Sequence, residues 1–306
     1  MPDPRYSPTF FIIGAPKCGT TSLYYYFNHH PDICMSIPKE PRYVELIDRC
    51  DFQTSYEEAF RHWSGEKALG EASPTYLFVP YVAKRLNQHY PNARLIAVLR
   101  DPIERAYSDW WMYYSKGIEK RSFRDCVLKN LKCITDKNRF EGYEGETRWK
   151  NQVRTIEQKR RIGEPFYIDV GHYGEQLTRY FSLFSPEQIQ VIRADELVAE
   201  PKRILSELYC FLEVTPNVHF DAGGRFNSAM GNIPAPLLSL FRAAQQVRLP
   251  LFLPAFVKEA VRSHFRLRGG RPAIDKETFC ILKSHFIDDV RRLERLLGRK
   301  FDGWLN

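Results

Sequence analysis

The sequence lacks the features that mark a secreted or membrane-spanning chain. Its first residues, MPDPRYSP, contain no apolar core of a secretory signal. The most apolar later segment, 237–257, is interrupted by Arg242, Arg248 and two prolines. A spanning helix needs about 18 uninterrupted apolar residues. We therefore expect no integral membrane segment and a cytoplasmic location.

Metal-ligand and disulfide patterns are also missing. The seven cysteines are an odd number, are scattered, and include no C-x-x-C pair and no histidine at zinc-ligand spacing. This usage favours reduced thiols over a disulfide framework. We expect no metal site.

The composition is that of a soluble globular protein. Of the 306 residues, 43% are hydrophobic and 27% are charged, which excludes disordered, collagen-like and coiled-coil classes. No internal repeat or Gly/Ser linker divides the chain, so we predict a single domain over 1–306, with a helical subregion at 223–266 that could border an acceptor. The net charge of +8 favours an anionic partner, and nucleic acid, acidic membrane, polyanionic glycan and nucleotide all remain open.

Apolar runs and helical patterns alternate along the chain. Strands are predicted at 9–14, 68–72, 94–99 and 189–193, and helices at 20–30, 80–89, 103–116, 201–211 and 275–297. The charge-rich segment 119–161 is predicted to form exposed helices outside the sheet. Alternating strands and helices predict an α/β fold with a mainly parallel central sheet flanked by helices. Ligands of such sheets lie at the carboxyl ends of the strands.

The stretch from Gly14 to Thr21 reads GAPKCGTT and stands between a predicted strand and a predicted helix. Backbone N–H groups and the positive helix end in such a loop can surround a phosphate. It is not a Walker loop, because Thr20 follows the second glycine and Lys17 lies inside the loop. A nucleotide triphosphatase and a merely structural glycine turn are the alternatives.

This loop resembles the 5′-phosphosulfate loop of sulfotransferases that use 3′-phosphoadenosine 5′-phosphosulfate (PAPS). The segment 94–116 resembles the family's 3′-phosphate element, with Arg100 at the strand end and Ser108 eight residues later. Ser108 is about two helical turns beyond Arg100, so both can face one phosphate. For Arg100 the alternative is a surface ion pair with Asp101 or Glu104.

The resemblance implies a three-layer α/β fold like that of P-loop kinases, PAPS as co-substrate, and no metal. It implies that Lys17 acts on the leaving group. The PAPS-binding residues that it implies are Ala15, Pro16, Lys17, Cys18, Gly19, Thr20, Thr21, Ser22, Arg100 and Ser108, with Gly270 and Arg271 from a basic loop at 268–272.

The catalytic base is assigned from the same resemblance. Ser22-Leu23 after the threonines is similar to the branch that contains heparan sulfate sulfotransferases and many bacterial enzymes, in which the base is a glutamate shortly after the first helix. Glu40 stands at that point. Its alternative is a solvated pair with Lys39 or Arg42. Glu71 is the rival base, although a buried carboxylate that fixes a loop is the better interpretation of it.

Two functions are compared. The first is a sulfotransferase that acts on a hydroxyl or amine of a small-molecule, natural-product or glycan acceptor; Ala72, where heparan enzymes often carry lysine, argues against a heparan-like acceptor. The second is a non-catalytic polyanion- or nucleotide-binding protein. Clustered basic residues with interleaved aromatics would support the second, but only short runs occur, at 159–161 and 266–271. We therefore expect no nucleic-acid partner, and the oligomeric state stays open.

Overall fold

Five parallel strands form one sheet in the computed structural model, which describes residues 4–46, 52–134, 140–159, 166–216 and 272–306. The strand order is β2-β3-β1-β4-β5. The strands are β1 (Phe10–Gly14), β2 (Ile33–Met35), β3 (Ala68–Ala72), β4 (Arg94–Leu99) and β5 (Ile189–Arg193). The predicted parallel α/β sheet is confirmed.

Helices cover both faces of this sheet, and the central strand shows why. All five residues of β1 are buried, as is typical of a strand covered on both faces. Successive side chains of a strand point to opposite faces. Phe10 meets Phe27 of α1 (Thr20–Asn28), with ring centroids 5.5 Å apart, while Phe11 meets Tyr90 after α4 (Pro80–His89), at 5.2 Å. These apolar contacts hold the loop that follows β1.

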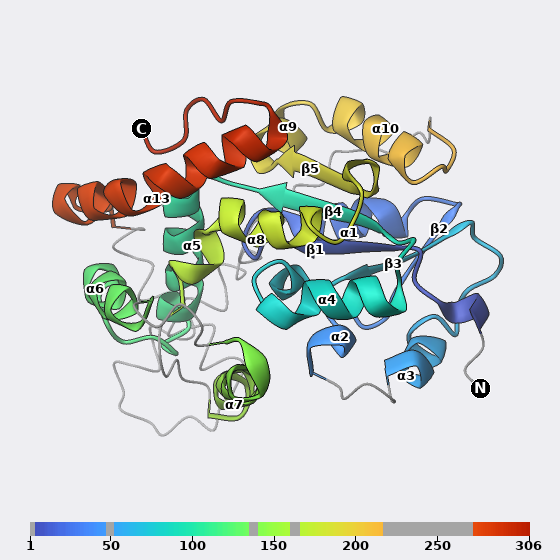
Figure 1. The fold of residues 1–306 in the computed structure, drawn as a ribbon, viewed down its shortest axis with the longest axis horizontal. Helices are drawn as coiled ribbons and strands as arrows, with labels where there is room; N and C mark the ends of the chain where they lie inside the picture. Colours follow the sequence, from blue (N-terminus) through green and yellow to red (C-terminus); the bar gives the residue numbers. More distant parts are fainter. Residues whose placement is uncertain (1–3, 47–51, 135–139, 160–165, 217–271) are drawn as a thin grey trace, which may run out of the picture.

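The other helices are distributed around this core (Figure 1). They are α2 (Tyr43–Leu46), α3 (Phe52–Ala59), α5 (Pro102–Ser115), α6 (Phe123–Ile134), α7 (Gly142–Lys159), α8 (Tyr173–Phe181), α9 (Ala194–Ala199), α10 (Pro201–Phe211) and α13 (Lys276–Leu297). In Figure 1, β4 and β5 point toward the side where α5, α6 and α7 lie. A ligand at the carboxyl ends of the strands would therefore meet these helices.

One expectation about this side was wrong in part. The described residues of 119–161 do form helices outside the sheet, but α7 is not simply exposed. Trp149 is only 1% exposed and Val153 is 4% exposed. Charged residues occupy the other face of α7, so the segment as a whole looks polar while its buried face is apolar.

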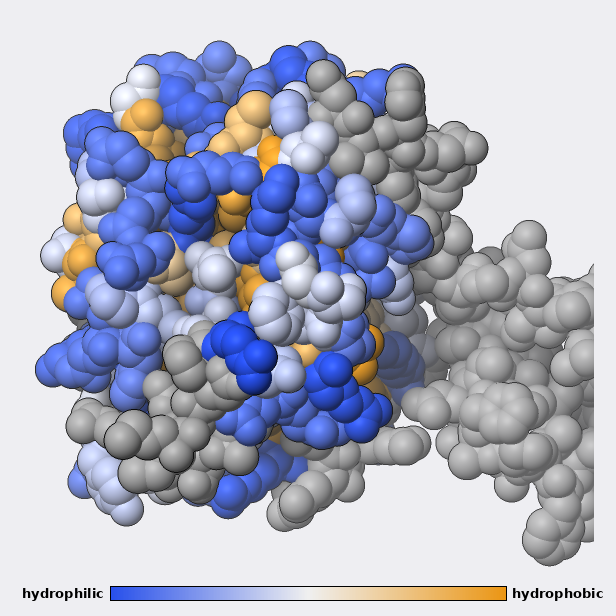
Figure 2. Space-filling view, turned by 90° about the vertical axis from the view of Figure 1, so that its right-hand side faces the viewer, coloured by the Kyte–Doolittle hydropathy of each residue, from blue (hydrophilic) through white to orange (hydrophobic). Residues whose placement is uncertain are grey.

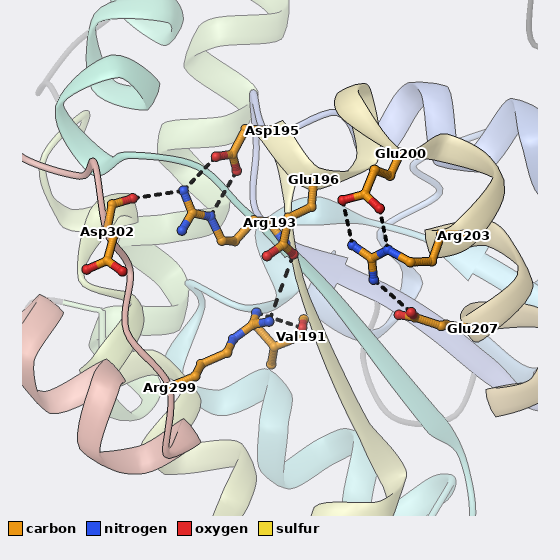
Figure 3. Close-up of polar contacts among 9 residues, drawn as sticks. All are labelled: Val191, Arg193, Asp195, Glu196, Glu200, Arg203, Glu207, Arg299 and Asp302. Atoms are coloured by element: carbon orange, nitrogen blue, oxygen red, sulfur yellow. Dashed lines mark hydrogen bonds and ion pairs between the residues drawn. The ribbon is translucent and has the colours of Figure 1, made fainter.

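The last residues of the chain return across the sheet and are held by polar contacts (Figure 3). Arg193 at the end of β5 pairs with Asp195 at 2.6 Å and donates to the carbonyl oxygen of Asp302 at 3.1 Å. Arg299 donates to the carbonyl oxygen of Val191 at 2.9 Å. Residues 299–302 are thereby fixed beside β5.

The surface at the opposite end of the sheet, where the strands begin, is mainly hydrophilic. Figure 2 views this end, and hydrophilic residues predominate on it, with only scattered apolar ones. In the described parts of the chain, no helix combines the length and the apolar character needed to cross a bilayer.

Candidate active site

The loop after β1 has a backbone shape that suits an anion. Gly14 lies so close to Leu77 that an added Cβ would stand 2.6 Å from the Leu77 Cβ. Lys17 and Gly19 then adopt positive φ angles of 70° and 95°, which is uncommon for a residue other than glycine. Gly19 is the N-cap of α1, and the amides of the first turn, starting at Thr20, have no acceptor within the helix. This loop therefore presents N–H groups and a positive helix end.

A cavity of about 580 Å³ opens in front of this loop. Its first wall comes from the loop, the end of β4 and the start of α5. Its second wall comes from the loop after β2, the turn after β3, the second half of α5, and α7. The lining residues are Pro16, Lys17, Gly19, Thr20, Thr21, Arg100 and Ser108 on the first wall, and Glu40, Arg42, Pro74, Thr75, Asp109, Met112, Tyr113, Trp149, Val153, Ile156 and Phe166 on the second.

Lys17 projects its ammonium group into this cavity. Its Nζ lies 3.3 Å from the Met112 Sδ, and a thioether is a weak acceptor. Within the described residues this ammonium pairs with no carboxylate. Burial lowers the pKa of Lys17, and the negative charge of Asp109 offsets part of that effect. Lys17 is thus a half-buried cation that is available to an anionic ligand.

Arg100 and Ser108 are positioned by the junction of β4 and α5. Asp101 caps α5, and its Oδ1 accepts hydrogen bonds from the amides of Ile103 at 2.8 Å and Glu104 at 3.0 Å. Its other carboxylate oxygen accepts from the Leu305 amide at 2.6 Å. The C-terminal segment therefore supports the element that carries Arg100.

The surface ion pair that was the alternative role for Arg100 is also present. Its Nη2 lies 3.1 Å from Glu104 Oε2, and the two side chains are 36% and 49% exposed. Such an exposed pair contributes little to stability. Arg100 can therefore exchange this partner for a phosphate, and it lines the cavity together with Ser108.

Three predicted PAPS-binding residues are absent from the described lining of the cavity: Ala15, Cys18 and Ser22. The Ala15 amide donates to the Val98 carbonyl oxygen at 2.8 Å, so it continues the pairing of β1 with β4. The Cys18 Sγ lies 3.6 Å from the Tyr173 hydroxyl, and burial raises the pKa of Cys18. These two residues support the loop from behind.

The two remaining predicted residues, Gly270 and Arg271, lie outside the described part of the chain.

Glu40 reaches the cavity from the loop after β2. Its amide donates to the Ala72 carbonyl oxygen at 3.1 Å, which ties this loop to the end of β3. Its carboxylate is in contact with the Lys39 ammonium, and the Glu40 side chain is 47% exposed. The alternative of a solvated pair is therefore present. Such an exposed pair is weak, and Glu40 lines the same cavity as Lys17.

Glu71 has different surroundings. It is fully buried, and it accepts hydrogen bonds from the hydroxyls of Tyr56 and Ser73. The same Ser73 oxygen accepts from the Arg42 amide at 3.1 Å. Burial raises the pKa of Glu71 to about 7. Glu71 is not in the described cavity lining, and its contacts fit a carboxylate that fixes the loop of Glu40 and Arg42.

Sequence reasoning missed several residues in the second wall and next to it. Glu45 is fully buried, accepts from the Thr75 hydroxyl and lies 3.7 Å from Arg42 Nη1, and burial raises the pKa of Glu45 to about 7. The apolar residues of α7 were also missed. Residues 149, 153 and 156 are spaced by four and three, which is the period of one helix face and could have indicated a buried stripe.

Comparisons with known proteins identify the family of this chain. The family model described as "Sulfotransferase domain" matches residues 7–222. Among curated proteins, the chain is 27% identical to the membrane-associated sulfotransferase kil1 of Dictyostelium discoideum, over 71% of this chain and 57% of that protein. It is 24% identical to the bifunctional heparan sulfate N-deacetylase/N-sulfotransferase 3 of Homo sapiens, over 97% of this chain and 31% of that protein. The chain thus covers about a third to somewhat more than half of these relatives.

A solved structure resembles the whole chain. It is a sulfotransferase from Alicyclobacillus acidocaldarius, with a TM-score of 0.68 and 25% sequence identity. The match covers 98% of this chain and 99% of the other. The likeness therefore extends beyond the segment that the family model matches.

Proposed function

The chain belongs to the sulfotransferase family, and we propose that it transfers a sulfuryl group from PAPS to a hydroxyl or amine of a small-molecule, natural-product or glycan acceptor. The observation that carries the proposal is one cavity that combines the amide-rich loop and Lys17, the pair Arg100 and Ser108, and the exposed carboxylate of Glu40. The loop with Lys17 and the pair Arg100 and Ser108 are suited to bind separate phosphate groups. The Glu40 carboxylate is suited to accept a proton.

The residues of the first wall fit the donor. The first-turn amides of α1 and the positive helix end suit a 5′-phosphosulfate, because they supply donors and partial positive charge at one point. Arg100 provides a planar fork of N–H donors for a 3′-phosphate. In the described residues, no group of three or more His, Cys, Asp or Glu side chains is arranged to hold a metal.

Bound PAPS would supply the sulfuryl group: its bond from sulfur to the bridging oxygen breaks as the acceptor's oxygen or nitrogen bonds to sulfur, and adenosine 3′,5′-bisphosphate leaves. Lys17 would then stabilise the negative charge that develops beside the loop, and a preformed cation in a half-buried site is effective in this role. Glu40 would accept the acceptor's proton, since its carboxylate borders the same cavity.

The test combines binding with transfer. Calorimetric titration with adenosine 3′,5′-bisphosphate is expected to show stoichiometric binding, and adenosine 5′-phosphate, which lacks the 3′-phosphate, should bind more weakly. Incubation with sulfur-labelled PAPS and a panel of alcohols, amines and saccharides should label at least one acceptor. Absence of nucleotide binding would refute the proposal. Binding without transfer to any member of the panel would favour a non-catalytic nucleotide-binding protein.

A further inference from the structure

The second wall of the cavity differs from the first in chemistry. The first carries the loop amides, Lys17 and Arg100, whereas α7 contributes Trp149, Val153 and Ile156 to the second. Phe166 lies beside them and is 7% exposed. Pockets for apolar molecules are lined in this way, with a few polar groups that set orientation.

The indole at the centre of this wall is held in place. Its ring centroid lies 5.3 Å from that of Phe78, 5.5 Å from that of Phe140 and 5.6 Å from that of Phe166, each in an edge-to-face arrangement. Such aromatic contacts add stability beyond the buried area. Trp149 and Val153 are almost fully buried and back this side of the cavity, whereas the half-buried Ile156 is the α7 side chain that offers apolar surface to it.

Charged residues on this wall face charged partners within the protein. Among the described lining residues of the second wall, Arg42 is the only cation, and its Nη1 already faces Glu45 Oε1 at 3.7 Å. Asp109 is paired with the buried Arg105 at 3.1 Å. A polyanionic glycan would need several cations to receive its sulfates and carboxylates. The described residues of this wall do not supply them.

We infer that the acceptor is an uncharged alcohol or phenol with an apolar body, which packs against Ile156 in front of the buried Trp149 and Val153 and directs its hydroxyl toward Glu40. This inference rests on the proposed sulfuryl transfer and specifies its acceptor. Burial of each additional methylene against such a wall contributes about 0.8 kcal/mol, which is about fourfold in affinity.

The first test is a series of 4-alkylphenols from methyl to heptyl, offered with labelled PAPS. We expect kcat/KM to rise about fourfold per methylene until the wall is covered. The affinity of the same phenols for the enzyme saturated with adenosine 3′,5′-bisphosphate should rise in parallel by calorimetry, a readout that needs no turnover. Desulfated heparan sulfate should be a poor acceptor.

A pair of variants on one helix tests the location. Ile156→Glu puts a carboxylate into the half-buried wall and should weaken heptylphenol binding at least about tenfold, since an unpaired charge disfavours an apolar ligand. Asn151→Glu adds the same charge on the exposed face of α7 and should change nothing. Ile156→Ala, which introduces no charge, should weaken heptylphenol binding less. Affinity for adenosine 3′,5′-bisphosphate should stay constant in Asn151→Glu and Ile156→Ala.

The outcomes separate this inference from the proposed function. Transfer to desulfated heparan sulfate but not to alkylphenols, or equal affinities along the phenol series, would overturn the apolar acceptor and leave sulfuryl transfer intact. Failure to bind adenosine 3′,5′-bisphosphate would overturn both. Equal effects of Ile156→Glu and Asn151→Glu on heptylphenol binding would show that this face of α7 is not part of the acceptor site.

Discussion

Replacement of Lys17 by methionine is expected to slow sulfuryl transfer by about two to three orders of magnitude without unfolding the protein. The structure explains why this variant should stay folded. Among the described residues, the Lys17 ammonium makes a weak contact with the Met112 sulfur at 3.3 Å. Its burial lowers the pKa of Lys17, so the protein holds this charge at a cost. Methionine fills similar space and removes that cost.

The size of the catalytic effect follows from Coulomb's law. Two unit charges at about 4 Å interact with about 4 kcal/mol at an effective dielectric constant of about 20, which suits a half-buried site. Only the part that strengthens in the transition state lowers the barrier. Loss of about 2.7–4 kcal/mol corresponds to the expected 10²–10³-fold decrease in kcat.

The assay measures transfer of labelled sulfate together with thermal unfolding. Lys202→Met removes one positive charge from an exposed position of α10 and is the matched control. We expect Lys17→Met to lose activity and keep its Tm, and Lys202→Met to keep both. A Lys17→Met protein that is folded and transfers sulfate at the normal rate would refute the role of this cation.

Three further predictions concern other residues. Glu40→Gln should lower kcat about 10²–10⁴-fold and leave the Kd for adenosine 3′,5′-bisphosphate unchanged; an unchanged kcat would exclude Glu40 as the base. Arg100→Ala should weaken adenosine 3′,5′-bisphosphate at least about tenfold and adenosine 5′-phosphate hardly at all; equal losses would contradict a 3′-phosphate contact. Burial, with a smaller effect of His172, lowers the pKa of His285 to about 4. As pH drops, the unfolded chain therefore binds a proton at His285 before the folded protein does. The free energy of unfolding should fall as pH drops from about 6.5 toward 4. A His285→Gln variant whose free energy of unfolding, from denaturant titrations, depends on pH in the same way would argue against this.

Much of the sheet could be predicted because the residues that form it carry a local pattern. The strands at 68–72, 94–99 and 189–193 match the structure in both bounds. The apolar run within 94–99 suits a strand that is buried on both faces. Strand β2 was missed because three residues, Ile33–Met35, are too few to show a period. The single domain over 1–306 and the cytoplasmic location stay predictions.

The site was less accessible to sequence reasoning than the sheet. Lys17, Arg100 and Ser108 stand in motifs of fixed spacing, so they could be named in advance, and the structure brings them to one cavity. The difference between Glu40 and Glu71 depends on tertiary packing: one borders the cavity, whereas the other is fully buried beneath the neighbouring loop. The wall formed by α7 also depends on packing, because it is more than 100 residues from the phosphate loop in sequence.

A crystal structure with adenosine 3′,5′-bisphosphate tests the central claim most directly. We predict the 5′-phosphate on the amides of residues 19–21 within reach of the Lys17 ammonium, and the 3′-phosphate on Arg100 and Ser108. A nucleotide bound elsewhere, with this cavity unoccupied at saturating concentration, would contradict the assignment of the donor site.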